Sequence, residues 1–118
     1  MKNLAPDITR QRLLIEGYYA INVDKEAIKS YFKKVTESLN LRVYGEPIIF
    51  SPQGEGKGIN QGYDAFVPLI DSGIYLGAWT NAKFLSIVIY TCKNFDENKA
   101  VGVTKNFFRI GEIEYQSF

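Results

Sequence analysis

The sequence contains no histidine and only one cysteine, Cys92. Without histidine, catalysis by Ser-His-Asp or Cys-His groups is excluded, and so are the common zinc sites. A single cysteine excludes an internal disulfide and any metal site built from several thiolates. A site made of oxygen ligands stays open, but no cluster of carboxylates in the sequence indicates one. We therefore predict no metal.

The chain also lacks a surplus of either charge. It has 14 basic and 13 acidic residues, which leaves a net charge of +1. Binding to a phosphate backbone needs a clear basic excess, so we expect no nucleic-acid partner, and an anionic membrane surface would attract the chain weakly. No apolar stretch is long enough to span a bilayer, and residues 1–12 contain no apolar signal region. The expected location is cytoplasmic, with no membrane association.

The composition is otherwise that of a folded protein. Hydrophobic residues make up 46% of the 118 residues and charged residues 23%, so disorder over most of the chain is excluded. A chain of this length suits one domain over residues 1–118, in which residues 1–11 form a polar lead-in.

Hydrophobic periodicity predicts two helices, at residues 24–39 and 96–106, with Asp24 or Asn22 capping the first and Asp96 the second. Stretches rich in β-branched and aromatic residues predict strands at 12–20, 41–50, 65–70, 74–79, 84–92 and 107–115. Consecutive strands pair mostly antiparallel, so the order β-α-β-β-β-β-α-β predicts an α+β two-layer sandwich with both helices on one face of the sheet.

The longest expected loop, residues 51–64, contains Gly54, Gly56, Lys57 and Gly58. Glycines around a lysine invite comparison with phosphate-binding loops. However, no Ser or Thr follows Lys57 and no helix follows the loop, so the pattern favours a surface loop or lid.

The most informative stretch runs from Asp71 to Cys92. It opens with Asp71-Ser72-Gly73 at an expected turn, contains the only tryptophan, Trp79, and ends on the only cysteine. If its two strands pair antiparallel, Ser72, Trp79 and Cys92 could share one pocket. The alternative is a serine that only caps a turn and a thiol that is only buried.

This stretch resembles the prokaryotic S-adenosylmethionine decarboxylases, whose pattern is approximately E-S-H-x-x-x-H-T-W-P followed by a strand that ends in T-C. Asp71 and Ser72 stand at the acidic and serine positions, Trp79 at the tryptophan, and Thr91-Cys92 at the T-C pair. Further similarity lies at residues 12–18, 50–54 and 96–100, so the resemblance covers most of residues 12–108.

Two positions depart from that pattern. Gly73 replaces the histidine after the serine, and Gly77 replaces the histidine five positions after the serine. In the resembled family the second histidine takes part in self-processing. The resemblance is therefore more specific for the fold than for the activity.

The resemblance implies a two-layer α+β fold and a homodimer with active sites at the subunit interface. It also implies that Ser72 attacks the carbonyl of Asp71 and becomes a pyruvoyl group, an electron sink that standard side chains do not provide. Cys92 would then donate a proton to the decarboxylated carbon. Glu16, Tyr18 and Trp79 are candidates to hold a cationic substrate such as S-adenosylmethionine, although packing within a strand or the core explains them equally well.

Three functions stay open on the sequence. The first is a pyruvoyl-dependent decarboxylase of S-adenosylmethionine or another amino acid. The second is a relative that does not process itself and binds a small molecule or regulates an active partner. The third is a relative that runs different chemistry without a pyruvoyl group. The last two need no cofactor.

Overall fold

The computed structural model describes residues 1–51 and 61–118. Along the chain lie β1 (Gln11–Tyr18), α1 (Lys25–Ser38), β2 (Ile48–Phe50), β3 (Gly62–Leu69), β4 (Ser72–Trp79), β5 (Phe84–Thr91), α2 (Glu97–Phe108) and β6 (Ile113–Ser117). This is the order of elements that the sequence predicts.

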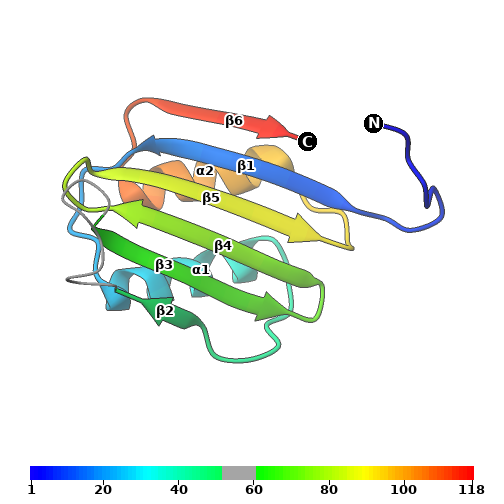
Figure 1. Ribbon diagram of the computed structural model, residues 1–118, viewed down its shortest axis with the longest axis horizontal. Coiled ribbons are helices and arrows are strands. Elements are labelled where there is room, and N and C mark those ends of the chain that lie inside the picture. Colours follow the sequence, from blue (N-terminus) through cyan, green and yellow to red (C-terminus); the bar gives the residue numbers. More distant parts are fainter. Residues whose placement is uncertain (52–60) are drawn as a thin grey trace.

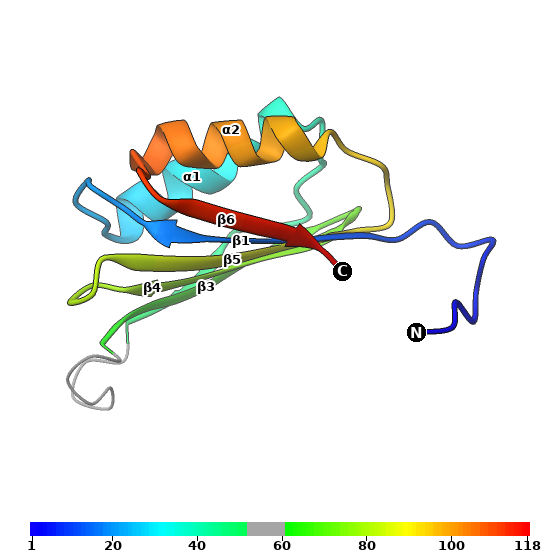
Figure 2. The same cartoon turned by 90° about the horizontal axis from the view of Figure 1, so that it is seen from above.

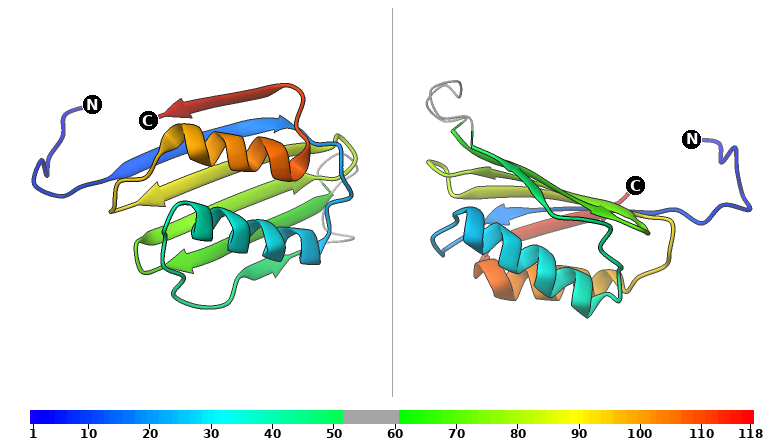
Figure 3. Two further views of the ribbon diagram at one scale, coloured as in Figure 1. Left: turned by 180° about the vertical axis from the view of Figure 1, so that it is seen from behind. Right: turned by 90° about the horizontal axis from the view of Figure 1, so that it is seen from below.

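The strands form one six-stranded sheet in the order β2-β3-β4-β5-β1-β6, and every neighbouring pair is antiparallel (Figure 1). Both helices lie on the same side of this sheet, as Figures 2 and 3 show. The predicted α+β two-layer sandwich with helices on one face is confirmed.

The core lies between the sheet and the two helices. Alternate residues of the central strands face the helices and are buried, among them Leu13, Ile15, Ile74, Leu76, Ile87 and Ile89. The helices contribute Ile28, Tyr31, Phe32, Val35 and Phe108. Each such side chain stabilises the fold by about 1.5–3 kcal/mol through removal of apolar surface from water.

The helix starts follow the predicted caps. The Asp24 carboxylate accepts a hydrogen bond from the backbone N–H of Ala27 at 2.8 Å, and the Asp96 carboxylate accepts one from Lys99 at 3.1 Å. Helix α2 continues to Phe108, two residues beyond the expected end, and stops where Arg109 adopts a left-handed conformation with φ 52°. The last strand therefore begins at Ile113 instead of residue 107.

The expected strand over residues 41–50 is mostly wrong, because only Ile48–Phe50 is a strand and Val43 forms an isolated bridge to Leu69. The backbone N–H of Leu41 bonds instead to the carbonyl of Thr36 in α1, and that of Arg42 bonds to the side chain of Asp71. Pro47 has no N–H to donate and comes just before β2, which lies at the edge of the sheet as predicted.

The second face of the sheet carries no helix (Figure 2). It is rich in exposed aromatic rings. Tyr18 is 55% exposed, Phe50 64%, Phe66 41% and Tyr90 40%. We call this surface the open face. No helix within residues 1–51 and 61–118 is long and apolar enough to cross a membrane.

Candidate active site

The turn between β3 and β4 contains the serine that the sequence singles out. Leu69 pairs with Ser72 across this turn, and Ile70 and Asp71 form its tip. Ser72 has φ 125°, a backbone conformation that glycine adopts readily and other residues rarely do. Such a conformation costs on the order of 1–3 kcal/mol, so the surrounding contacts must hold the turn in place.

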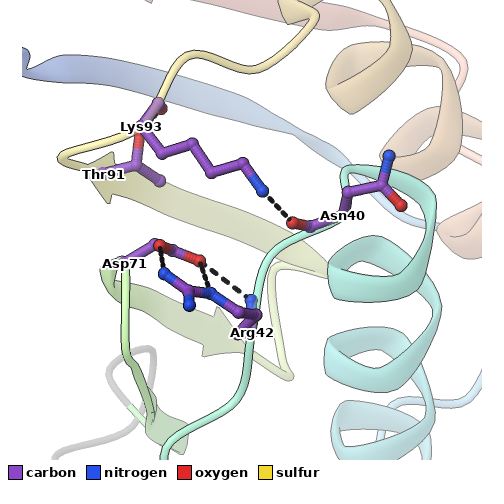
Figure 4. A network of polar contacts seen from close by, with 5 residues as sticks. All are labelled: Asn40, Arg42, Asp71, Thr91 and Lys93. Atoms are coloured by element: carbon purple, nitrogen blue, oxygen red, sulfur yellow. Dashed lines mark hydrogen bonds and ion pairs between the residues drawn. The ribbon is translucent and has the colours of Figure 1, made fainter.

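Arg42 supplies those contacts through the side chain of Asp71, which is only 2% exposed (Figure 4). The Arg42 guanidinium donates to Oδ1 of Asp71 at 2.7 Å and to Oδ2 at 3.4 Å, and its backbone N–H donates to Oδ2 at 3.0 Å. The side-chain hydrogen bonds from Arg42 are the main reason that the pKa of Asp71 falls to about 2. The carboxylate is therefore an ionised anchor near neutral pH and a poor general base.

The main-chain carbonyl of Asp71 is held separately. Its oxygen accepts a hydrogen bond from the backbone N–H of Cys92 at 2.9 Å. The sheet register places Ser72 opposite Thr91, and Cys92 follows directly, with an exposed side chain. The structure thus brings the backbones of the predicted catalytic residues Asp71, Ser72 and Cys92 together at one end of the sheet. The register places Ser72 on the face of buried Thr91, which is directed to the helices, so the pairing alone does not bring the Ser72 hydroxyl to the Cys92 thiol.

The segment after Cys92 is tied to the end of helix α1. Thr91 Oγ1 donates to the carbonyl of Lys93 at 2.6 Å, and Lys93 Nζ donates to the carbonyl of Asn40 at 2.6 Å (Figure 4). These bonds connect the ends of β5 and α1 beside the Asp71 turn. They surround the turn with the positive charges of Arg42 and Lys93.

The predicted substrate-binding residues lie together on the open face, away from the Ser72 turn. The rings of Tyr18 and Trp79 flank that of Phe84, with centroid distances of 5.4 Å and 5.6 Å. Two positions before Tyr18 in β1, Glu16 accepts a hydrogen bond from Ser86 Oγ of β5 at 2.8 Å. A half-buried carboxylate beside aromatic rings can bind a cation by charge and by cation–π contact.

The two groups lie at opposite ends of β4. Seven residue steps separate Ser72 from Trp79, which corresponds to about 23 Å along an extended strand. The expectation that Ser72, Trp79 and Cys92 share one pocket is therefore wrong within a single chain. In an antiparallel hairpin the residues beside the turn pair with each other, so Trp79 meets Phe84 while Ser72 meets Thr91 at the far end.

Gly77, which stands where the family pattern has its second histidine, is crowded by its own strand. A Cβ atom at this position would lie 2.8 Å from the hydroxyl oxygen of Tyr75 and 3.3 Å from the Trp79 ring. The Tyr75 hydroxyl donates to Asp64 Oδ1 at 3.0 Å. Burial above all, and then this contact with Asp64, raise the pKa of Tyr75 to about 12, so its phenol stays protonated near neutral pH.

Sequence reasoning missed Arg42 and Asp64. Arg42 is 29 positions from Asp71, and nothing in its local sequence indicates the pairing. Asp64 becomes relevant only once the register places it opposite Gly77. Gly54, Gly56, Lys57 and Gly58 lie outside the described residues. Among the described residues, no group of three or more Asp, Glu and Cys side chains is placed to hold a metal ion.

Comparison with known proteins gives one family. The family model described as S-adenosylmethionine decarboxylase matches residues 11–118, nearly the whole chain. The chain belongs to the S-adenosylmethionine decarboxylase family. The resemblance seen in the sequence is thereby confirmed.

A solved structure of the family supports the fold of this S-adenosylmethionine decarboxylase homologue. The crystal structure of the adenosylmethionine decarboxylase from Aquifex aeolicus VF5 superposes with a TM-score of 0.71, covering 94% of this chain and 89% of that one. The two sequences are 19% identical, so this likeness establishes the fold alone. No curated protein sequence matches the chain significantly.

Proposed function

We propose that this protein is a pyruvoyl-dependent decarboxylase that generates its electron sink from Ser72. The observation that carries the proposal is the geometry of the Asp71–Ser72 peptide. Ser72 has a strained φ of 125°, and the Asp71 carbonyl oxygen is fixed by the N–H of Cys92. A strained peptide with a polarised carbonyl is prepared for attack by the adjacent hydroxyl.

The proposed processing begins when Ser72 Oγ attacks the Asp71 carbonyl carbon. Negative charge then develops on the carbonyl oxygen, where the Cys92 N–H already donates, and one such donor typically contributes about 2.7–4 kcal/mol. The C–N bond breaks, the nitrogen takes up a proton, and an ester replaces the peptide. A base next removes the Cα proton of Ser72, and the ester C–O bond breaks to release the Asp71 carboxylate. Hydrolysis of the new N-terminus releases ammonia and leaves a pyruvoyl group.

The residues at this turn fit such a group. A pyruvoyl group at position 72 would supply a carbonyl that condenses with the substrate amine and accepts the electrons of the carboxylate that leaves. The Cys92 thiol, which is exposed beside the turn, would give its proton from Sγ to the carbon left behind. Arg42 would keep the new C-terminal residue Asp71 in place after cleavage.

The proposed substrate is S-adenosylmethionine or another cationic amino acid, bound by Glu16, Tyr18 and Trp79. Because Trp79 lies about 23 Å from Ser72 along the strand, one chain cannot complete the site. A two-fold homodimer packed through the open faces, with the strands of the copies antiparallel, would bring the Ser72 turn of one copy toward Trp79 of the other. The exposed rings of Phe50 and Phe66 provide apolar surface for that contact.

A second candidate is a homologue that binds a small molecule without processing itself. The arrangement around Gly77 favours it, because the Tyr75 hydroxyl lies where a side chain at position 77 would begin. Asp71 is a poor base and Tyr75 stays protonated, so neither of these residues replaces the missing histidine.

Intact mass under denaturing conditions tests the proposal. Loss of a positioned base slows a reaction by about 10²–10⁴-fold, so freshly purified protein should be mostly one chain near 13.4 kDa. Over days at 37 °C we expect two fragments that join at positions 71 and 72, with a blocked second N-terminus, and hydroxylamine should cleave any accumulated ester. Ser72→Ala should give none of these products. If wild type and Ser72→Ala stay equally intact, the pyruvoyl-dependent decarboxylase proposal is overturned.

The homodimer has a separate test. Sedimentation velocity at micromolar concentrations should give twice the chain mass, and Phe66→Lys on the open face should shift the protein toward monomer. A wild-type monomer at all concentrations would contradict the composite site.

A further inference from the structure

The N-terminal segment and the open face enclose a hollow, which we call the Arg12 hollow. Residues 1–10 extend past the end of the sheet and bend back on the side away from the helices (Figure 2). The hollow has a volume of about 910 Å³. Its charged and aromatic lining residues are Lys2, Arg10, Arg12, Tyr90 and Phe118, and its apolar ones include Leu4 and Ile8.

Arg12 is the central feature of this hollow. It belongs to β1 and lies opposite Tyr90 on the open face. Its guanidinium carbon is 5.7 Å from the centroid of the Phe118 ring, and its Nε is buried without a hydrogen-bond acceptor. A buried charged donor with no acceptor is costly, and no carboxylate within the described residues forms an ion pair with Arg12.

The other cations of the hollow leave its charge uncompensated. Arg10 contacts the carbonyl of Ala5 at 3.3 Å and the side-chain oxygen of Asn3, and these neutral acceptors shape the turn of the segment. Lys2 also lines the hollow, and none of the lining residues is acidic. Three positive side chains therefore converge on a space that contains no negative one.

We propose that the Arg12 hollow binds a small organic anion, a carboxylate or phosphate attached to an aromatic or apolar body. A planar guanidinium binds either group through two parallel N–H···O bonds. The anion would give Arg12 Nε its missing acceptor. The rings of Tyr90 and Phe118, which are 40% and 56% exposed, would contact the apolar body of the same ligand.

This hollow lies near the Ser72 turn but does not depend on processing. Tyr90 in β5 pairs with Arg12 in β1 and with Gly73 in β4. Gly73 directly follows Ser72, so the hollow begins next to the Ser72 turn. All of its lining residues are in place in the uncleaved chain. Failure of Ser72 to process would therefore leave this proposal standing, and failure of anion binding would leave the decarboxylase proposal standing.

The direct test is the Arg12 Nε–H signal in a ¹H–¹⁵N spectrum. Phenyl phosphate and benzoate should each shift this signal in a saturable manner. Inorganic phosphate should shift it with an affinity about tenfold weaker, because it lacks a ring to bury. An Arg12 signal that no probe moves would overturn the site, and equal affinity for inorganic and phenyl phosphate would overturn the role of the rings.

Matched variants assign the binding to Arg12. Arg12→Met should weaken phenyl phosphate binding by at least about tenfold, and Arg12→Lys should weaken it less, because lysine keeps the charge and loses the planar fork. Arg109→Met, at the C-terminus of α2, is the control and should bind as the wild type does. If folded Arg12→Met binds phenyl phosphate as tightly as the wild type, the proposal is refuted. If Arg12→Met does not fold, wild-type affinity in Arg12→Lys refutes the proposal instead.

The same measurement separates a ligand from a second copy of the chain. Association through the open faces can shift the Arg12 signal without added anion, but phenyl phosphate should then shift it further in a saturable manner. A position that moves as the protein associates, and that then ignores phenyl phosphate, would mean that a carboxylate of another copy occupies the hollow and would overturn the proposal.

Discussion

The backbone nitrogen of Cys92 lies 2.9 Å from the carbonyl oxygen of Asp71 and donates a hydrogen bond to it. This bond continues the pairing of β4 and β5 by one position beyond Ser72 and Thr91. The residue that carries the only thiol thus fixes, through its backbone, the carbonyl that Ser72 would attack. Strand pairing and the proposed chemistry depend on the same contact.

Replacing Ser72 with glycine should stabilise the uncleaved protein. Glycine adopts φ 125° without strain, while its greater freedom in the unfolded chain offsets part of that gain, so we expect the free energy of unfolding to rise by about 1 kcal/mol. Urea denaturation of freshly purified protein measures this. Ser86→Gly, in the regular part of β5, is the control and should destabilise by a similar amount; a loss in both variants would show that the Ser72 turn is not strained.

Acid should weaken the fold through Asp71. The pKa of this carboxyl is about 2 in the folded chain against 3.8 ordinarily, so its contribution is complete above about pH 4 and is lost as pH falls from 4 toward 2. Denaturation curves at pH 6, 4 and 3 should show this loss in the wild type and a flatter acid dependence in Asp71→Asn. Asp7→Asn, at an exposed position, should keep the wild-type slope.

Removing either partner of the buried hydrogen bond between the helices should destabilise the fold, but by different amounts. Tyr31 and Thr104 share a 2.8 Å hydrogen bond, and Thr104 Oγ1 also donates to the carbonyl of Ala100. Tyr31→Phe removes one bond and should cost about 1 kcal/mol, whereas Thr104→Val leaves the buried Tyr31 hydroxyl without a partner and should cost about 1–3 kcal/mol. Urea denaturation of the two variants gives the order, and equal costs would contradict it.

Restoring a base at position 77 should speed self-cleavage. Gly77→His introduces the imidazole of the family pattern, but its Cβ would meet the Tyr75 hydroxyl at 2.8 Å. We therefore expect faster cleavage in Gly77→His combined with Tyr75→Phe than in Gly77→His alone, followed by intact mass over time. Adding Ser72→Ala should stop cleavage in both. If neither variant cleaves faster than wild type, the missing histidine is not the limiting defect.

Local sequence patterns predicted where helices and strands lie better than they predicted which segments form hydrogen bonds with each other. The apolar spacing of α1 and the cap at Asp24 are short-range features, and both are confirmed. The strand expected at 41–50 failed because the backbone donors of Leu41 and Arg42 bond to α1 and to Asp71. Those partners are selected by packing, which residues 41–50 do not encode on their own.

The candidate site shows the same division. Similarity to a family pattern located Ser72, Trp79 and Cys92, but the expectation that they share one pocket treated closeness in sequence as closeness in space. The hairpin that joins β4 to β5 places Trp79 beside Phe84 and leaves Ser72 at the far end of the strand. The turn at residues 80–83, directly after Trp79, decides this, and only the register reveals it.

Residue identities and local periodicity are enough to establish the family, the order of the elements and the absence of a histidine base. The fold, in contrast, establishes that Arg42 anchors Asp71, that Tyr75 crowds Gly77, and that Arg12 Nε has no acceptor. Such contacts join residues from separate elements, or join side chains of one strand that the sheet places on the same face. They follow from the register of the sheet and from the packing of the whole chain, which set the distances between side chains.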